Sequence, residues 1–391
     1  MSKGVKILIF SIIAVLYVVV RVSFLPLELN ERAIILGIGI DYEEETQNFV
    51  LSAEIATPKQ NAMGSESSAS QGSQKIVEGK GQSVGLAIRD LFNSFGKTPS
   101  FGECGIVMLG ETCAKQVSLQ NTLDYFVRSG AFRDGTIVVV SEGPAKKMLQ
   151  KKSQVDEYVS FALQTLLVQS GHKAQIQYTT LNTTAQGFFD KSKSCYLNLI
   201  KFEKQNSNES EGAQGENSNQ GKFKTGQMAL FSDGKYVGSL DRNQLDGLNL
   251  YGDKNIFCTF VDHTNPQKSA LALDKKDGKT EISVKGEKVN VKVDLTLGLK
   301  LLLTDTVGEV FPLRVKEGEK LSELQKQGAS KDAKKAITSA FEKCVETDCD
   351  FLGIKNALYA KYGKKYNDLI EKSGKDFWSK VNFDVVVNCN G

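Results

Sequence analysis

The sequence predicts an α+β protein of several domains, with mixed or antiparallel sheets packed against helices and one N-terminal transmembrane helix. Three features predict this: an apolar run from Ile7 to Val20, alternating strand and helix periodicities along most of the chain, and a polar segment from Glu203 to Gly221. A chain of 391 residues has room for two or three domains that each bury a core. Hydrophobic content of 40% and charged content of 24% are ordinary for globular domains.

The charge distribution gives no sign of a nucleic-acid partner. The formal net charge is only +3, and Lys and Glu residues alternate along the chain instead of forming a basic helix with interleaved aromatic residues. We therefore expect no nucleic-acid binding.

The N-terminal run predicts a membrane anchor over residues 1–26. Counted through Arg21 to Leu25, it covers about 19 positions, or roughly 28 Å of helix, which is close to the hydrocarbon thickness of a bilayer. Lys3 and Lys6 precede the run, so the N-terminus should stay in the cytoplasm and the rest should be exported. A cleaved signal peptide and a buried core helix remain alternatives, but no small-x-small cleavage site follows the run.

The first globular region, residues 27–202, is expected to start with strands. Ala33 to Ile40 is almost continuously apolar and predicts a buried strand, and an acidic turn follows. Phe49 to Ile55 alternates between large apolar residues and others, which predicts a strand with a period of two. A polar loop over 60–73 and a short strand from Lys75 to Glu78 come next.

Helices and strands then alternate. The spacing of apolar residues predicts helices over 84–95 and 119–127, strands over 104–109 and 135–140, and a helix opened by Gly143-Pro144. The resulting order β-β-(β)-α-β-α-β-α predicts a mixed sheet. Residues 141–202 predict one helix and several short strands, and a separate lobe split off near 141–150 is left open.

The polar segment predicts a linker over residues 203–224. It contains no large apolar residue up to Gly221, so it cannot bury enough surface to order itself, and it is either an interdomain linker or a long loop.

The second globular region, residues 225–391, is expected to be an antiparallel sheet covered by two or three helices. Ser232-Asp-Gly-Lys235 between two apolar runs predicts a hairpin, and 281–303 alternates between apolar and polar residues, as in a strand with one wet face. Helical stripes follow over 333–345 and 351–362, and the chain ends in an alternating strand over 381–389.

The seven cysteines do not form a recognisable site. There is no C-x-x-C, and no His lies near Cys344 and Cys349 to complete a zinc site. We expect most of them to be buried free thiols.

The strongest sign of catalysis is Gly81-Gln-Ser83-Val-Gly85, which fits the G-x-S-x-G nucleophile pattern, with His172 and His263 later in the chain. The preceding strand is short and no oxyanion-type glycine run is present. We therefore interpret Ser83 as the N-cap of the following helix.

Other motifs are weaker. Gly37-Ile-Gly39-Ile-Asp41 lacks the third glycine of a dinucleotide loop, so its glycines are interpreted as close strand packing. Asp348 and Asp350 lack the ligand spacing of a calcium loop. The sequence thus assigns no catalytic, cofactor-binding or metal-binding residue.

Four segments together resemble the Ger(x)C family, the C subunits of nutrient germinant receptors of spores. They are 28–41 (ELNERAIILGIGID), 101–140 (FGECGIVMLGE, then LDYFVRSGAFRDGTIVVV), 230–252 (beginning LFSDGKYVGSLD) and 350–391 (beginning DFLGI). Each segment is moderately specific, and all four occur in the family's order.

The resemblance implies a non-enzymatic, extracytoplasmic subunit that assembles with a multi-pass A subunit and a transporter-like B subunit in nutrient-triggered germination. It implies a location at the cytoplasmic or spore inner membrane. One departure is clear: the family's lipobox cysteine is missing, and Ser23-Phe24 stands near its position, so a single-pass peptide anchor must replace a lipid. A surface serine hydrolase using Ser83, and an envelope scaffold or solute-binding protein, are the alternatives.

Overall fold

The computed structural model describes residues 3–23, 32–56, 75–153, 156–172, 177–204, 220–252, 258–264, 266, 269–303, 314–315, 320–373 and 376–391. The first helix, α1 (Lys3–Ser23), exposes its apolar side chains, with Phe10 74% and Ile7 67% exposed. Within the described residues, no helix has both the length and the apolar character that a membrane span requires. The anchor expected over 1–26 stays a prediction.

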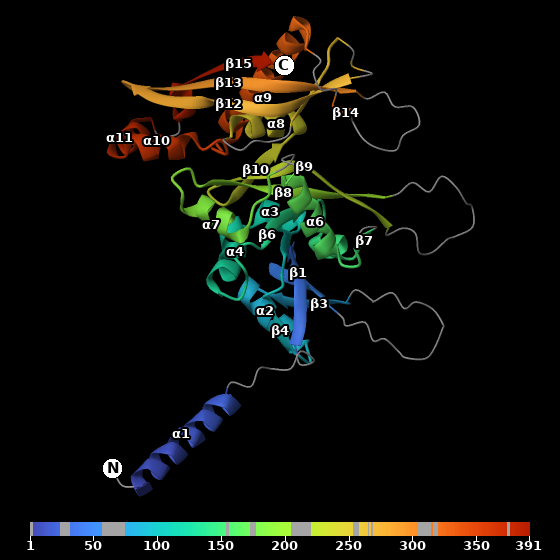
Figure 1. The fold of residues 1–391 in the computed structure, drawn as a ribbon, viewed down its shortest axis with the longest axis vertical. Helices are drawn as coiled ribbons and strands as arrows, with labels where there is room; N and C mark the ends of the chain where they lie inside the picture. Colours follow the sequence, from blue (N-terminus) through green and yellow to red (C-terminus); the bar gives the residue numbers. More distant parts are fainter. Residues whose placement is uncertain are drawn as a thin grey trace, which may run out of the picture.

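The described residues form two sheets, stacked along the long axis of the molecule (Figure 1). The first sheet has the strand order β10-β9-β8-β6-β5-β1-β2-β3. Its central strands β1 (Arg32–Glu43), β5 (Ile106–Leu109), β6 (Ile137–Ser141) and β8 (Ser194–Lys204) run parallel. β2 (Asn48–Ile55) and β3 (Lys75–Gly81) continue it in antiparallel pairing, and short strands β4 (Thr98–Ser100) and β7 (Lys152–Ser153) pair with β1 and β9.

Helices cover both faces of the first sheet. One face packs α2 (Val84–Asn93), α3 (Glu111–Gln116), α4 (Leu119–Arg128) and α7 (Leu181–Phe189), and the other packs α5 (Ala145–Leu149) and α6 (Val159–His172). β2 is therefore buried on both faces from Phe49 to Ile55, including the polar Ser52 and Glu54. The alternating sequence of this strand does not correspond to one solvent-exposed face. β8 pairs with β6 and therefore continues the same sheet.

The two ends of the expected linker, residues 203–204 and 220–224, belong to two paired strands. β8 pairs in antiparallel fashion with β9 (Gln220–Ser232), and β9 forms the predicted hairpin with β10 (Lys235–Leu240). Asp233 and Gly234 have φ of 48° and 75°, the left-handed values that such a turn needs. Residues 205–219 lie outside the described residues. Residues 220–224 were expected in the linker and 225–240 in the second region, but β9 and β10 complete the first sheet. The domain map of 1–26, 27–202, 203–224 and 225–391 stays a prediction.

The second sheet has the order β11-β12-β13-β14, with β15 also paired to β13. Its strands are β11 (Thr259–Val261), β12 (Ser269–Lys285), β13 (Lys288–Leu303), β14 (Arg314–Val315) and β15 (Val381–Asn390). β12 and β13 form a long antiparallel hairpin, so the β region expected over 281–303 is divided by a turn at residues 286–287. The expectation of a purely antiparallel sheet was wrong, because β15 runs parallel to β13. The helices between these two strands form the crossover that parallel pairing requires.

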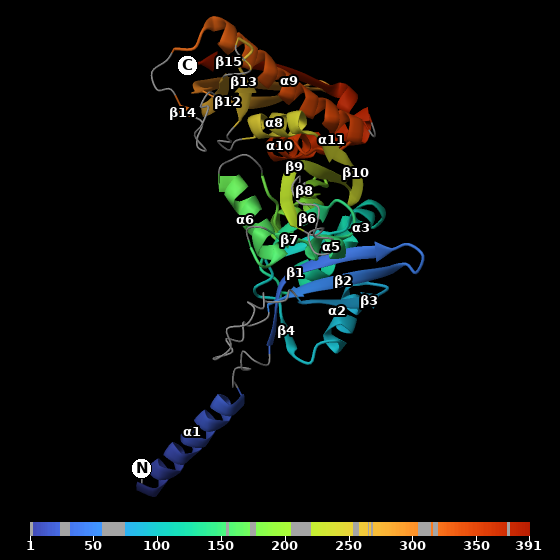
Figure 2. The same ribbon diagram turned by 90° about the vertical axis from the view of Figure 1, so that its right-hand side faces the viewer.

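One face of the second sheet packs against helices. They are α8 (Arg242–Tyr251), α9 (Glu323–Thr347), α10 (Ile354–Tyr362) and α11 (Lys364–Ser373), followed by the short 3-10 helix η4 (Trp378–Lys380). The view turned by 90° also places α8 and α10 between the two sheets (Figure 2). Met228 and Leu230 of β9 belong to the same core as these helices. The two sheets therefore meet over a shared apolar core.

Candidate functional site at the junction of the two sheets

Ser83 caps a helix, as the sequence analysis expected. Its Oγ accepts a hydrogen bond from the Leu86 N–H at 3.3 Å, and its backbone is extended at the N-cap of α2. Ser83 is exposed, and the helix that it caps packs against the first sheet through Val84 and Leu91. The hydroxyl therefore takes the local backbone contact that an N-cap makes.

The histidines are not brought to Ser83. The ring Nε2 of His263 lies 2.7 Å from Asp332 Oδ2, between the end of β11 and α9 of the second sheet. The side chain of His172 lies outside the described residues. Among the described residues, Ser83 thus has no histidine base beside it.

The glycines of the 37–41 motif allow helices to approach β1, as expected. A Cβ on Gly37 would lie 2.0 Å from Ser160 Oγ of α6, and one on Gly39 would lie 3.0 Å from the Ala145 Cβ of α5. These contacts explain both glycines by packing.

Asp41 lies at the carboxyl edge of the parallel strands, where open α/β sheets usually bind ligands. Its Oδ1 accepts from the Ala145 N–H at 2.7 Å and its Oδ2 from the Lys146 N–H at 2.9 Å, so it caps α5. Burial raises the pKa of Asp41 although these bonds favour its charged form. Gly110 leaves the space for this carboxylate, since a Cβ there would lie 2.0 Å from Asp41 Oδ1. The Asp41 carboxylate therefore occupies the place at the N-terminus of α5 where a bound anion could otherwise accept the backbone N–H groups.

Two further buried carboxylates cap helices in the same way. Glu54 accepts from the Val159 and Ser160 N–H groups at 2.9 and 2.8 Å at the start of α6. Asp350 accepts from the Ile354 and Lys355 N–H groups at 2.8 and 2.6 Å at the start of α10. Burial raises the pKa of Asp350 to about 7, against the lowering effect of its hydrogen bonds.

Asp350 also lies at the junction of the two sheets. We call residues 348–353, between α9 and α10, the α9–α10 loop. The Asp350 N–H donates to Ser194 Oγ of β8 at 2.9 Å, and Ser232 Oγ of β9 donates to the Asp348 carbonyl at 2.9 Å. The Cys349 thiol lies 3.4 Å from the Phe231 carbonyl oxygen. The loop therefore bonds to the ends of β8 and β9.

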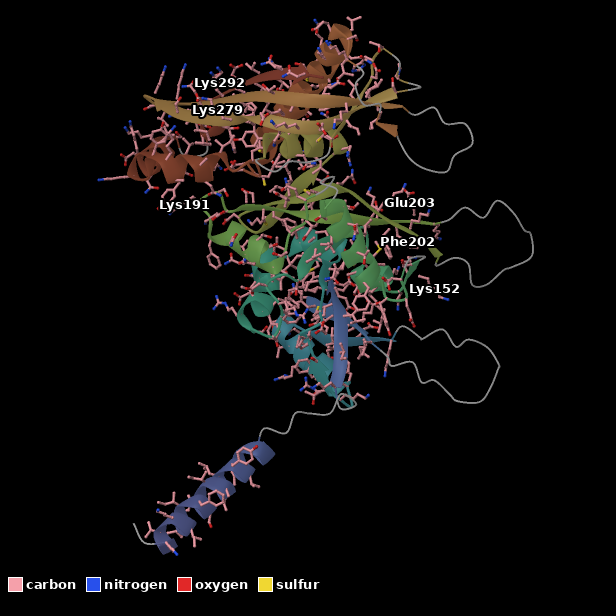
Figure 3. All side chains as sticks on the ribbon, in the orientation of Figure 1. Lys152, Lys191, Phe202, Glu203, Lys279 and Lys292 are labelled. Atoms are coloured by element: carbon pink, nitrogen blue, oxygen red, sulfur yellow. The ribbon has the colours of Figure 1, made fainter. Side chains whose placement is uncertain are left out.

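A second group of contacts borders the loop. Asn356 of α10 accepts from the Ser192 N–H at 3.1 Å and donates to Asp190 Oδ2 at 3.0 Å. Lys191 Nζ lies 4.8 Å from the ring centroid of Tyr359, at the rim between the sheets (Figure 3). Polar contacts thus surround the apolar core of the junction.

Buried hydrogen bonds connect the two sheets at the junction. Ser194 and Asp350 are buried, and their polar groups bond to each other and to neighbouring backbone. Within the described part of the chain, no group of three His, Cys, Asp or Glu residues is placed to hold a metal ion. The junction thus joins the two sheets through an apolar core and the hydrogen bonds of the α9–α10 loop.

The cysteines are free thiols, as expected, and all but the half-buried Cys389 are buried. Burial raises the pKa of Cys104 and of Cys349 to about 12, which keeps these groups as neutral thiols. Such thiols behave as small apolar side chains.

The capping role of Asp41, Glu54 and Asp350 was not predicted from the sequence. Asp41 and Glu54 precede their helices by more than 100 positions, so no local pattern connects them. Asp350 stands four residues before Ile354, and this nearby acidic residue was the available signal.

Two sequence models of one protein family match the chain in order. The model described as "Spore germination protein N-terminal domain" matches residues 26–202. The model described as "Spore germination B3/GerAC like, C-terminal" matches residues 226–390.

A protein and a solved structure show the same likeness. The spore germination protein KC of Bacillus subtilis (strain 168) is 22% identical over 369 residues, which cover 92% of this chain and 88% of that protein. The crystal structure of the GerBC protein matches with a TM-score of 0.54 at 12% identity, covering 90% of this chain and 96% of that chain. The structural likeness shows the mixed α+β fold.

Proposed function

Because the chain belongs to the GerAC-like family of spore germination proteins, we propose that it is the C subunit of a membrane germinant receptor acting in nutrient-triggered germination. The observation that carries this proposal is that both family models match in their natural order and together span 26–202 and 226–390. The relative from Bacillus subtilis, similar over most of both chains, supports it.

The subunit works without catalysis. Ser83 is used as a helix cap, and the carboxylates at the helix N-termini of α5, α6 and α10 bond to backbone N–H groups. Its work is to present sheet and helix surfaces to its partners, a multi-pass A subunit and a transporter-like B subunit, so that nutrient binding elsewhere shifts the state of the complex.

The subunit is held at the cytoplasmic or spore inner membrane by α1, and the bulk of the chain lies on the extracytoplasmic side. The exposed apolar side chains of α1 support insertion, and Lys3 and Lys6 support a cytoplasmic N-terminus. With Ser23 and Phe24 near the lipobox position, the peptide itself is the anchor.

Capture from spore membranes tests the proposal. A tagged full-length chain, crosslinked in membranes and purified in mild detergent, should bring down one multi-pass and one transporter-like subunit. Spores lacking the gene should lose the optical-density fall caused by their nutrient, and a wild-type or Ser83→Ala copy should restore it. A chain recovered alone, from spores that germinate normally without it, would exclude the receptor role.

A further inference from the structure

Asp348 ends α9 in a left-handed backbone conformation, which most residues with a Cβ avoid and aspartate adopts more readily. Its φ of 46° and ψ of 37° lie in the left-handed region, where helices usually place glycine. The Cys349 N–H bonds to the Cys344 carbonyl at 3.2 Å and completes this C-terminal turn. Most residues with a Cβ are disfavoured in this region by roughly 1–2 kcal/mol, and aspartate is among the exceptions because its short polar side chain can form hydrogen bonds nearby.

Contacts from three elements hold Asp348 in place. Its Oδ1 accepts from Trp378 Nε1 of η4 at 2.7 Å and from Lys355 Nζ of α10 at 3.1 Å. Its carbonyl accepts from Ser232 Oγ of β9 at 2.9 Å. Lys355 Nζ also lies 5.1 Å from the Trp378 ring centroid, which fixes the donors relative to each other. Side chains of η4, α10 and β9 therefore stabilise the left-handed turn.

The rest of the α9–α10 loop depends on this turn. Gly353, at its other end, has φ of 75° and open space where a Cβ would lie. Between the two left-handed residues, Cys349 and Asp350 bond to β9 and β8, and Phe351 and Leu352 are buried. If Asp348 returned to the right-handed region, the direction of the chain after α9 would change and these bonds would break.

We propose that the α9–α10 loop is a latch between the two sheets and that Asp348 is its release point. In the closed state, the side-chain contacts of Asp348 hold the turn and the loop bonds to β8 and β9. In the open state, Asp348 adopts right-handed helical angles, the loop leaves the first sheet, and the second sheet with its helices can move. Burial of Phe351 and Leu352 keeps the closed state dominant.

In a C subunit, the latch would let a conformational change in one sheet alter the position of the other. This role rests on the proposed function. The latch itself is a property of the isolated chain. Its test therefore has two separate readouts, amide hydrogen exchange for the latch and germination for the receptor role.

Hydrogen exchange of the purified full-length protein in detergent tests the latch. Asp348→Ala removes the carboxylate contacts and leaves a strained Cβ residue, so amides 349–353 and the facing ends of β8 and β9 should exchange about tenfold faster. Amides of β5 and β6 should be unchanged. Asp348→Asn keeps an acceptor for Trp378 and tolerates the left-handed region, so it should stay within about twofold of the wild type.

Two variants keep the test decisive if Asp348→Ala folds poorly. Trp378→Phe removes the Nε1 donor but keeps an aromatic ring, and it should accelerate the same amides. Ser379→Ala is the control and should change nothing, because the Ser379 hydroxyl donates to the nearby Asp376 carbonyl at 2.7 Å. Unchanged loop exchange in both Asp348→Ala and Trp378→Phe, or an equal acceleration throughout the chain, would overturn the latch.

Germination separates the two proposals. If both hold, Asp348→Ala spores should show an altered nutrient response at a normal protein level, and Ser379→Ala spores a normal one. Faster loop exchange with no role of the chain in germination would keep the latch and reject the receptor function. Slow, unchanged exchange in a functioning subunit would reject the latch alone.

Discussion

The backbone N–H of Asp350 donates a hydrogen bond to Ser194 Oγ at 2.9 Å, across 156 positions of the chain. Ser194 belongs to the first sheet and Asp350 to the helical layer of the second, and both are buried. This bond gives the buried Asp350 N–H a hydrogen-bond acceptor. Without that acceptor, the N–H would remain buried and unpaired, which is unfavourable for folding.

Removing that acceptor should weaken the junction. Ser194→Ala leaves the buried Asp350 N–H without its partner, which should lower the free energy of unfolding by about 1–3 kcal/mol. The exposed Ser379→Ala is the matched control and should be nearly neutral. Thermal unfolding of the full-length protein in detergent measures both variants, and equal stabilities would show that the bond contributes nothing.

Asp350 should make stability fall as the pH rises. Its pKa is about 7 in the folded protein against an ordinary value of 3.8, because burial disfavours the charge. The folded state therefore binds the proton more tightly, and this contribution is fully present below about pH 4 and is lost as the pH rises through 7. Asp350→Asn keeps a capping oxygen without the charge.

The stability of Asp350→Asn should accordingly depend less on pH between 4 and 8 than that of the wild type. Urea unfolding at closely spaced pH values gives the comparison. Parallel curves for the two proteins would show that Asp350 does not titrate in this range.

Gly110 and Asp41 should show coupled effects. Gly110→Ala places a Cβ 2.0 Å from Asp41 Oδ1, so the carboxylate must leave its position on α5, at a cost of about 1–3 kcal/mol. In an Asp41→Ala background the same change should cost much less. Gly102→Ala, where a Cβ meets nothing within 4 Å, is the control. Additive costs in the double variant would contradict the contact.

Ser83 should behave as a helix cap. Ser83→Ala should cost about 0.5–2 kcal/mol, and Ser83→Asp should largely preserve stability because it can also accept from the Leu86 N–H. A serine-reactive fluorophosphonate should not label the wild type. Stoichiometric labelling at Ser83 would instead indicate an activated nucleophile and favour the hydrolase.

Limited proteolysis should cut the chain between residues 203 and 221, because that composition offers no large apolar residue to order the segment. The two fragments should nevertheless stay together, since β8 and β9 pair from Ser194 with Ser232 to Lys204 with Gly221. Denaturing gels should show two pieces and size-exclusion chromatography one. Separation of the pieces without denaturant would contradict the shared sheet.

The sequence determined the features that depend on neighbouring residues. Alternation predicted β13, the Asp233-Gly234 turn predicted the β9–β10 hairpin, and the position of Ser83 predicted its cap. The resemblance of four segments predicted the family, which the two family models confirm. Propensity, periodicity and capping act over a few residues, so they can be read from the chain.

Tertiary structure alone decided how distant segments meet. β15 runs parallel to β13 because the intervening helices cross the sheet. Residues 220–240 join the first sheet because β9 pairs with β8. Asp41 and Glu54 cap helices more than 100 positions away. A carboxylate's sequence neighbours do not specify which helix end it will reach, because that depends on strand order and on helix packing against both faces of the sheet.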